Sequence, residues 1–143
     1  MDGEAPLRDT EAAADRGTAG ARLGIAMLDT RFPRPPGDVG NPATWPFPVR
    51  YHVVRGARAA RVVGGDEAAH LEAFAEAGRA LVAAGCTGIA TTCGFLVPLQ
   101  DRLSAALGVP VASSSLMQVP AVAATLPPGR VPGVVTISRA ALG

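Results

Sequence analysis

The stretch "TGIATTCGFLVPLQDRLSAALGVPVASSS", residues 87–115, decides the fold of this 143-residue chain. A short apolar run, 87–92, is followed by a cysteine and a glycine, and then by a helical pattern that ends at Gly108. A second apolar run, 109–115, closes in three serines. Strand, helix and strand in this order predict a β-α-β unit with parallel strands.

The same alternation continues on both sides of this unit. Further strands are predicted at 22–28, 49–56 and 131–138, and further helices at 64–85 and 116–126. A proline-rich loop, 29–48, joins the first two strands. We therefore expect an α/β domain over residues 21–143, with a mostly parallel sheet of four to five strands covered by helices on both faces. Residues 1–20 are polar and rich in Gly and Ala, and are expected to be a disordered lead.

Composition narrows the class of partner. The net charge is +1 and charged residues make up 17% of the chain, so no basic surface for nucleic acid or an anionic membrane is expected. No apolar run approaches the roughly 20 residues that cross a bilayer, and the first residues lack the pattern of a signal peptide. We expect a cytoplasmic protein that acts on a small molecule, with neither a nucleic-acid nor a membrane partner.

All 13 basic residues are arginine. A pyridoxal-phosphate enzyme needs a lysine for its Schiff base, and a Walker-type phosphate loop needs one as well. Both classes are excluded for this chain. The two cysteines, Cys86 and Cys93, form no metal or redox motif, and a strand between them would keep them too far apart for a disulfide.

Cys93 is the candidate catalytic residue. Ligands of parallel α/β sheets bind beyond the carboxyl ends of the strands, and Cys93 stands at such an end. The free N–H groups of the next helix are expected to lower its pKa toward a usable thiolate. The candidate substrate-binding residues at the same edge are Asp29, Thr91, Thr92, Gly94, Ser113 and Ser114. Alternative roles are turn formation for Asp29, helix capping for the serines and core packing for either cysteine, above all for Cys86. No metal site is predicted.

Two segments carry a resemblance to a known family: "RLGIAMLDT" and "AGCTGIATTCGFLVPLQDRLSAALGVPVASSS". Together with the strand order over roughly 22–138, they resemble the aspartate/glutamate/hydantoin racemase superfamily, which includes maleate isomerases and arylmalonate decarboxylases. The resemblance implies two pseudo-symmetric flavodoxin-like halves, each with one catalytic cysteine and no cofactor. It implies that Cys93 belongs to the N-terminal half and that this chain is a fragment holding that half.

The resemblance implies a cofactor-independent isomerase that acts on a small carboxylate or a hydantoin through Cys93. Racemase, isomerase and decarboxylase chemistry stay open. A homodimer is one arrangement that would bring two Cys93 thiols together. The alternative function is a non-catalytic α/β module that retains the fold and binds a small carboxylate.

Overall fold

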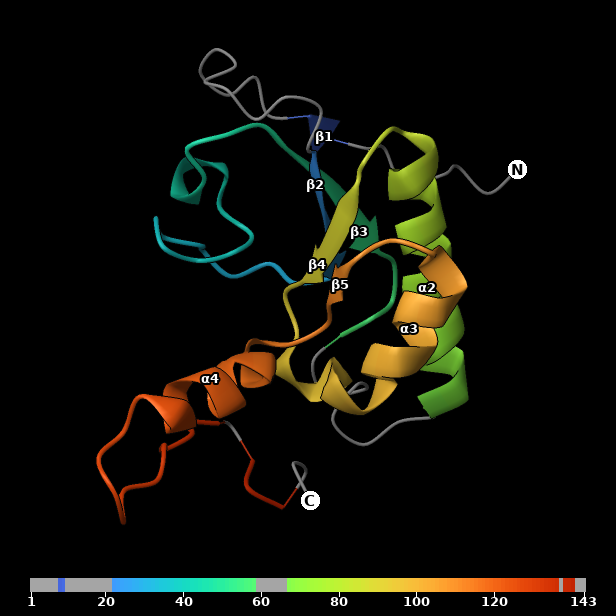
Figure 1. The fold of residues 1–143 in the computed structure, drawn as a ribbon. Helices are drawn as coiled ribbons and strands as arrows, with labels where there is room; N and C mark the ends of the chain where they lie inside the picture. Colours follow the sequence, from blue (N-terminus) through green and yellow to red (C-terminus); the bar gives the residue numbers. More distant parts are fainter. Residues whose placement is uncertain (1–7, 10–21, 59–66, 137, 141–143) are drawn as a thin grey trace.

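The computed structural model describes residues 8–9, 22–58, 67–136 and 138–140 (Figure 1). The strands are β1 (Arg8–Asp9), β2 (Leu23–Leu28), β3 (Val49–Val54), β4 (Gly88–Thr91) and β5 (Val111–Ala112). The α-helices are α2 (Glu67–Ala83), α3 (Gln100–Leu107) and α4 (Val119–Ala124). Three 3-10 turns complete the described elements: η1 (Pro42–Thr44), η2 (Gly94–Leu99) and η3 (Ser115–Gln118).

The strands form one sheet in the order β1-β3-β2-β4-β5. Strands β2 to β5 are parallel, and only the two-residue β1 pairs antiparallel, with β3. The predicted α/β class is therefore confirmed. Because the four parallel strands point the same way, their carboxyl ends share one edge of the sheet, which is where a ligand site is expected.

Both long helices lie on one face of the sheet, whereas helices were predicted on both faces. Connections between parallel strands are right-handed. The steps β3 to β4 and β4 to β5 run in one direction across the sheet, so α2 and α3 share a face, where they contact each other. The step β2 to β3 runs in the opposite direction, and its connection is the proline-rich loop. That loop, not a helix, covers the second face (Figure 1).

Alternate residues of β2 face these two layers. Ala26 and Leu28 belong to the larger core, beneath α2 and α3, while Ile25 packs with Val49 and Tyr51 into a smaller core. Partly buried residues of the loop close this smaller core: Val39, Trp45 and Phe47. These apolar contacts hold the loop against the sheet, so its other side chains have defined positions.

The predicted helix ends are confirmed at two glycines. Gly85 follows α2 and Gly108 follows α3, with φ of 90° and 64°. Both values are in the left-handed region, where glycine lacks the steric cost of a Cβ. The Gly108 N–H donates to the Ser104 carbonyl and closes α3. The predicted start of the longer helix, at residues 64–66, lies outside the described residues.

The strand predicted at 131–138 is wrong. Residues 131–136 and 138 are irregular, and Val131 and Val135 are 84% and 103% exposed. This segment follows α4, which projects from the body of the domain (Figure 1). Pro132 cannot donate a ladder hydrogen bond and Gly133 adds no packing, so apolar content alone does not place the segment in the sheet.

The predicted N-terminal lead contains one described element. Arg8–Asp9 form β1 and pair with β3, because β3 would otherwise be an open edge. The remainder of residues 1–20 lies outside the described part of the chain. Among the described residues, no helix has both the length and the apolarity that a membrane crossing requires.

Candidate active site

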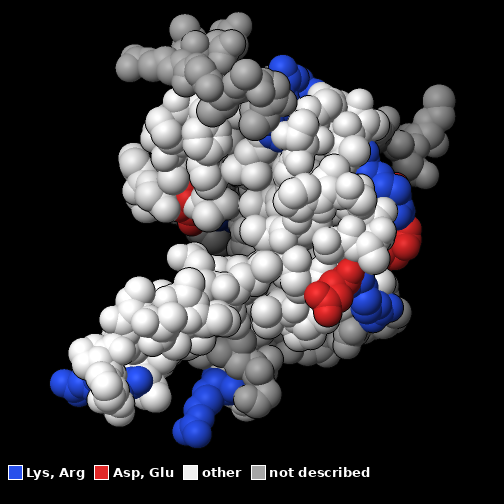
Figure 2. Space-filling model, in the orientation of Figure 1, with Lys and Arg blue, Asp and Glu red and all other residues white. Residues whose placement is uncertain are grey.

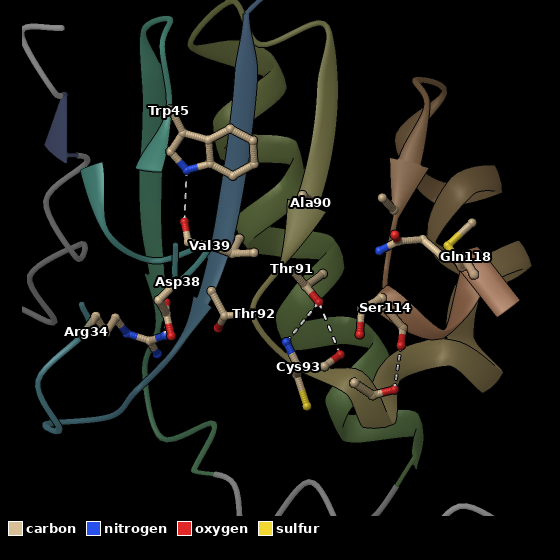
Figure 3. A pocket seen from close by; sticks show the side chains of 14 residues that line it. Arg34, Asp38, Val39, Trp45, Ala90, Thr91, Thr92, Cys93, Ser114 and Gln118 are labelled. Atoms are coloured by element: carbon tan, nitrogen blue, oxygen red, sulfur yellow. Dashed lines mark hydrogen bonds and ion pairs between the residues drawn. The ribbon is translucent and has the colours of Figure 1, made fainter. Parts of the chain in front are cut away.

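A pocket of about 430 Å³ lies at the carboxyl edge of the parallel strands. This volume is in the range of small-molecule sites. Three segments line the pocket: the loop after β2, residues 90–94 at the end of β4, and residues of β5 and η3. Figure 2 shows a hollow between the body of the domain and the projecting C-terminal segment, and Figure 3 shows the lining side chains.

The end of β4 is held by hydroxyl groups that bond to backbone. Thr91 Oγ1 accepts the Cys93 N–H at 3.2 Å and donates to the Ser113 carbonyl at 2.7 Å. Ser114 Oγ donates to the Gly94 carbonyl at 2.8 Å and accepts the Leu116 N–H at 3.1 Å. These bonds tie the end of β4 to the end of β5, so the backbone at Cys93 is fixed from both sides (Figure 3).

Cys93 is the first residue before η2, in an extended conformation, and its side chain is 6% exposed. Burial raises the pKa of its thiol above the ordinary value, because the charged thiolate is desolvated. The backbone N–H groups of Phe95 and Leu96 lower this pKa, but by less. The prediction of a lowered pKa is therefore wrong. The backbone N–H groups after Cys93 do lower the pKa, as the sequence predicted. Burial of the thiol raises the pKa by more, and the sequence did not predict that burial.

The structure brings most of the predicted site residues together. Thr91, Thr92, Cys93, Gly94 and Ser114 all line the pocket. Because the hydroxyls of Thr91 and Ser114 are bonded to backbone, these two residues hold the pocket's shape. The role of these residues in binding substrate stays a prediction.

Two predicted residues do not line the pocket. Asp29 accepts the Gly56 N–H at 3.1 Å through Oδ2 and ties the end of β2 to the turn after β3. Ser113 is fully buried; its N–H donates to Gln100 Oε1 and its carbonyl accepts from Thr91. Both residues lie near the predicted edge. The side chain of Asp29 and the backbone of Ser113 form hydrogen bonds that hold the ends of the strands in place.

Sequence reasoning missed the residues that the loop contributes: Arg34, Asp38, Val39 and Trp45. Arg34 Nη1 contacts Asp38 Oδ1 at 2.7 Å, and Arg34 Nη2 donates to Thr30 Oγ1 at 2.8 Å. Trp45 donates its indole N–H to the Val39 carbonyl at 3.0 Å. Two features of the sequence could have pointed to these residues. The loop after the first buried strand holds an Arg and an Asp four residues apart, and it also holds the chain's single Trp.

The raised pKa of Cys93 sets the expected pH dependence of its alkylation. The neutral thiol does not react, so the rate should rise with pH through a midpoint above that of a free cysteine. A bound cation should move the midpoint down, since a positive charge favours the thiolate. Iodoacetamide labelling from pH 6 to 10, with peptide mapping and tetramethylammonium as the cation, checks both points. A midpoint below that of free cysteine would contradict the structure.

Fold and pocket together define an α/β protein with a pocket at the carboxyl edge of its parallel strands. No family model and no solved structure matches this chain. Among curated proteins, it is similar to dimethylsulfoniopropionate lyase 7 of Emiliania huxleyi, with 35% identity over 101 residues that cover 70% of this chain and 30% of that protein. Lyases 6 and 3 of the same organism are each 34% identical over 101 residues, covering 26% of their length. The chain thus spans less than a third of these relatives.

These relatives correct the expectation drawn from the resemblance. They are named lyases, and no family model supports the racemase superfamily, so the predicted membership and the predicted isomerase activity are wrong. The resemblance rested on the first predicted strand, on a strand-end cysteine followed by a glycine and a helix, and on the order of the strands around them. That arrangement is a property of the fold and can serve more than one reaction class.

Proposed function

We propose that this chain carries the site of a lyase that cleaves dimethylsulfoniopropionate, or a close sulfonium carboxylate, by β-elimination. The observation that carries the proposal is Cys93, which lines the pocket and also packs in the larger core, in a pocket that holds an arginine–aspartate pair as well. The similarity to curated lyases supports the reaction class.

The reaction needs one base. The Cys93 thiolate takes a proton from the carbon next to the substrate carboxylate, and the electrons of that C–H bond form a carbon–carbon double bond. The bond between the next carbon and sulfur breaks, and its electron pair leaves with sulfur as neutral dimethyl sulfide. The products are acrylate, dimethyl sulfide and the proton on Cys93, which passes to solvent. Racemisation, by contrast, needs groups on both faces of the carbon.

Cys93 is better placed as this base than the other titratable lining groups. The pocket lining contains Arg34, Asp38 and Cys93 as its titratable side chains among the described residues. Asp38 Oδ1 accepts from Arg34 Nη1 and from the Gly40 N–H, both at 2.7 Å, so this oxygen is already engaged. An arginine does not lose its proton in proteins. We therefore assign proton removal to the Cys93 thiol, with Asp38 kept in its ion pair with Arg34.

The substrate can activate the thiol. A buried thiol with a raised pKa is neutral at rest, which protects it from side reactions. A sulfonium cation that enters the pocket favours the thiolate, because opposite charges within about 4–6 Å stabilise each other. The backbone N–H groups of Phe95 and Leu96 act in the same direction. The base would thus form when its substrate is present.

Neither cysteine of the chain forms a disulfide, and both are buried. Unpaired thiols are typical of reducing compartments, whereas secreted proteins of this size often carry disulfides. We keep the cytoplasm as the proposed compartment on this ground.

Substrate deuterated at the carbon next to the carboxylate tests the proposed step. If proton removal by Cys93 limits turnover, the deuterated substrate should be cleaved several-fold more slowly than the normal one. Deuteration at the two S-methyl groups is the matched control and should leave the rate unchanged. Equal rates for all three substrates, with 3-hydroxypropionate as the product, would show displacement by water and contradict the elimination.

A further inference from the structure

Arg34 presents unused hydrogen-bond donors to the pocket. Its guanidinium has five N–H donors, and two are used, one by Asp38 and one by Thr30. The other three have no partner among the described residues, although the side chain is only 12% exposed. Water or a ligand that enters the pocket can meet these donors. A carboxylate is the ligand that a guanidinium binds best.

Asp38 presents the complementary charge. Its Oδ1 accepts from Arg34 and from the Gly40 backbone, while its Oδ2 has no partner among the described residues. The Asp38 side chain is 28% exposed and lines the same pocket. Trp45 lines it as well, and an aromatic ring attracts onium cations through its electron-rich face. Figure 3 shows all three residues on one side of the pocket, across from Ser114 and Gln118.

The loop around the pair fixes the geometry of Arg34. The Asn41 side-chain amide donates to the Arg34 carbonyl, and the Arg34 guanidinium stacks over the Phe32 ring at 4.6 Å. A Cβ at Gly40 would lie 2.7 Å from Arg34 Cδ, so glycine leaves the space that this side chain occupies. A charged pair held this closely is organised before ligand arrives, which lowers the entropic cost of binding.

We propose that Arg34 and Asp38 select a zwitterion: the guanidinium binds the substrate carboxylate, and the free oxygen of Asp38 faces the onium group beside Trp45. This rests on the proposed function, because it assigns the two charges of a sulfonium carboxylate to named residues. A simple anion would be attracted by Arg34 and repelled by Asp38, and a simple cation the reverse. Only a molecule that carries both charges gains from both residues.

The proposal also gives Arg34 a second effect. Removal of a proton from the carbon next to a carboxylate builds negative charge on that carboxylate. A guanidinium already bound there stabilises the charge as it develops, which is the kind of fixed electrostatic contact that lowers barriers. Arg34 is therefore a substrate-binding residue whose loss should affect both KM and kcat.

Binding of unreactive probes to the purified 143-residue protein tests this selection without any turnover. Isothermal titration calorimetry would compare 3-(trimethylammonio)propanoate, which has both charges, with propanoate and with propyltrimethylammonium. The zwitterion should bind about 10- to 100-fold more tightly than either singly charged probe, as expected for charge-assisted hydrogen bonds. Arg34→Gln should remove most of this preference. Asp38→Asn should lower the affinity for the zwitterion, because the attraction of its cationic group is lost. The same change should raise the affinity for propanoate, because the repulsion of the anion is lost.

Exposed residues of the same charge supply the controls. Arg31 is exposed in the same loop and Asp101 is exposed on α3, so Arg31→Gln and Asp101→Asn should leave all three affinities unchanged. If Arg34→Gln disturbs the circular dichroism spectrum, Arg34→Lys keeps the charge and should retain part of the preference. Equal affinities of the wild-type protein for propanoate and the zwitterion would overturn the selection. Selection without cleavage of the sulfonium substrate would instead contradict the proposed function alone.

Discussion

Replacing Cys93 by serine is expected to lower kcat for cleavage of dimethylsulfoniopropionate by about 10²–10⁴-fold, the usual contribution of a positioned general base. A serine hydroxyl is nearly the same size but is far less acidic than a thiol, so it cannot supply the anion that removes the proton. The pocket's charged pair is untouched by this change. Binding of 3-(trimethylammonio)propanoate should therefore stay within about twofold of the wild-type value, well under 1 kcal/mol. Steady-state kinetics and calorimetry on the same preparation measure both quantities.

The second thiol of the chain is the matched control. Cys86 is 3% exposed and packs in the larger core beside Gly24, away from the pocket lining. Cys86→Ala should leave kcat unchanged while lowering the free energy of unfolding slightly. Wild-type kcat in Cys93→Ser, or the same loss in Cys86→Ala, would show that Cys93 is not the base.

Replacing Phe74 by alanine is expected to lower the free energy of unfolding by about 3–5 kcal/mol. Phe74 is 2% exposed in α2 and belongs to the larger core between that helix and the sheet. Its removal takes away buried apolar area and leaves a cavity. Domains of this size are stable by about 5–15 kcal/mol, so the variant should lose a large share of its stability. Urea unfolding followed by circular dichroism gives the value.

Val135→Ala is the control for this experiment. Val135 is 103% exposed, and substitutions at such positions change stability by about 0.5 kcal/mol or less. A loss of more than 1 kcal/mol in this variant would mean that Val135 is covered by some part of the protein. A loss of less than 1 kcal/mol in Phe74→Ala would mean that α2 does not pack on the sheet as described.

The helices and the parallel sheet were predictable because their signals are local. Gly85 and Gly108 end helices for a reason that depends on their own backbone angles. The apolar runs at β2, β3 and β4 are buried because each has a parallel neighbour to pair with. The run at 131–138 is also rich in valine, but it contains Pro132 and Gly133, and its described residues, 131–136 and 138, have no strand neighbour. The composition of a segment shows that it can form a strand, but not whether another strand lies beside it to pair with.

The candidate site was predictable in part for the same reason. Thr91 is the last residue of β4 and Cys93 comes two residues later, so the topology alone carries them to the carboxyl edge. Arg34 and Asp38 reach the same edge only through the path of a loop with six prolines across the second sheet face. That path depends on contacts of Val39, Trp45 and Phe47 with the smaller core. The pKa of Cys93 likewise depends on burial by distant residues, which local sequence does not report.

The most direct test of the central claim is product analysis. The purified 143-residue protein would be incubated with dimethylsulfoniopropionate, acrylate would be measured by proton NMR, and dimethyl sulfide by gas chromatography of the headspace. The account predicts acrylate and dimethyl sulfide in equal amounts from the wild-type protein, and neither above background from Cys93→Ser. Tight binding of the substrate with no acrylate formed would contradict it, and would leave a pocket that binds a zwitterion without cleaving it.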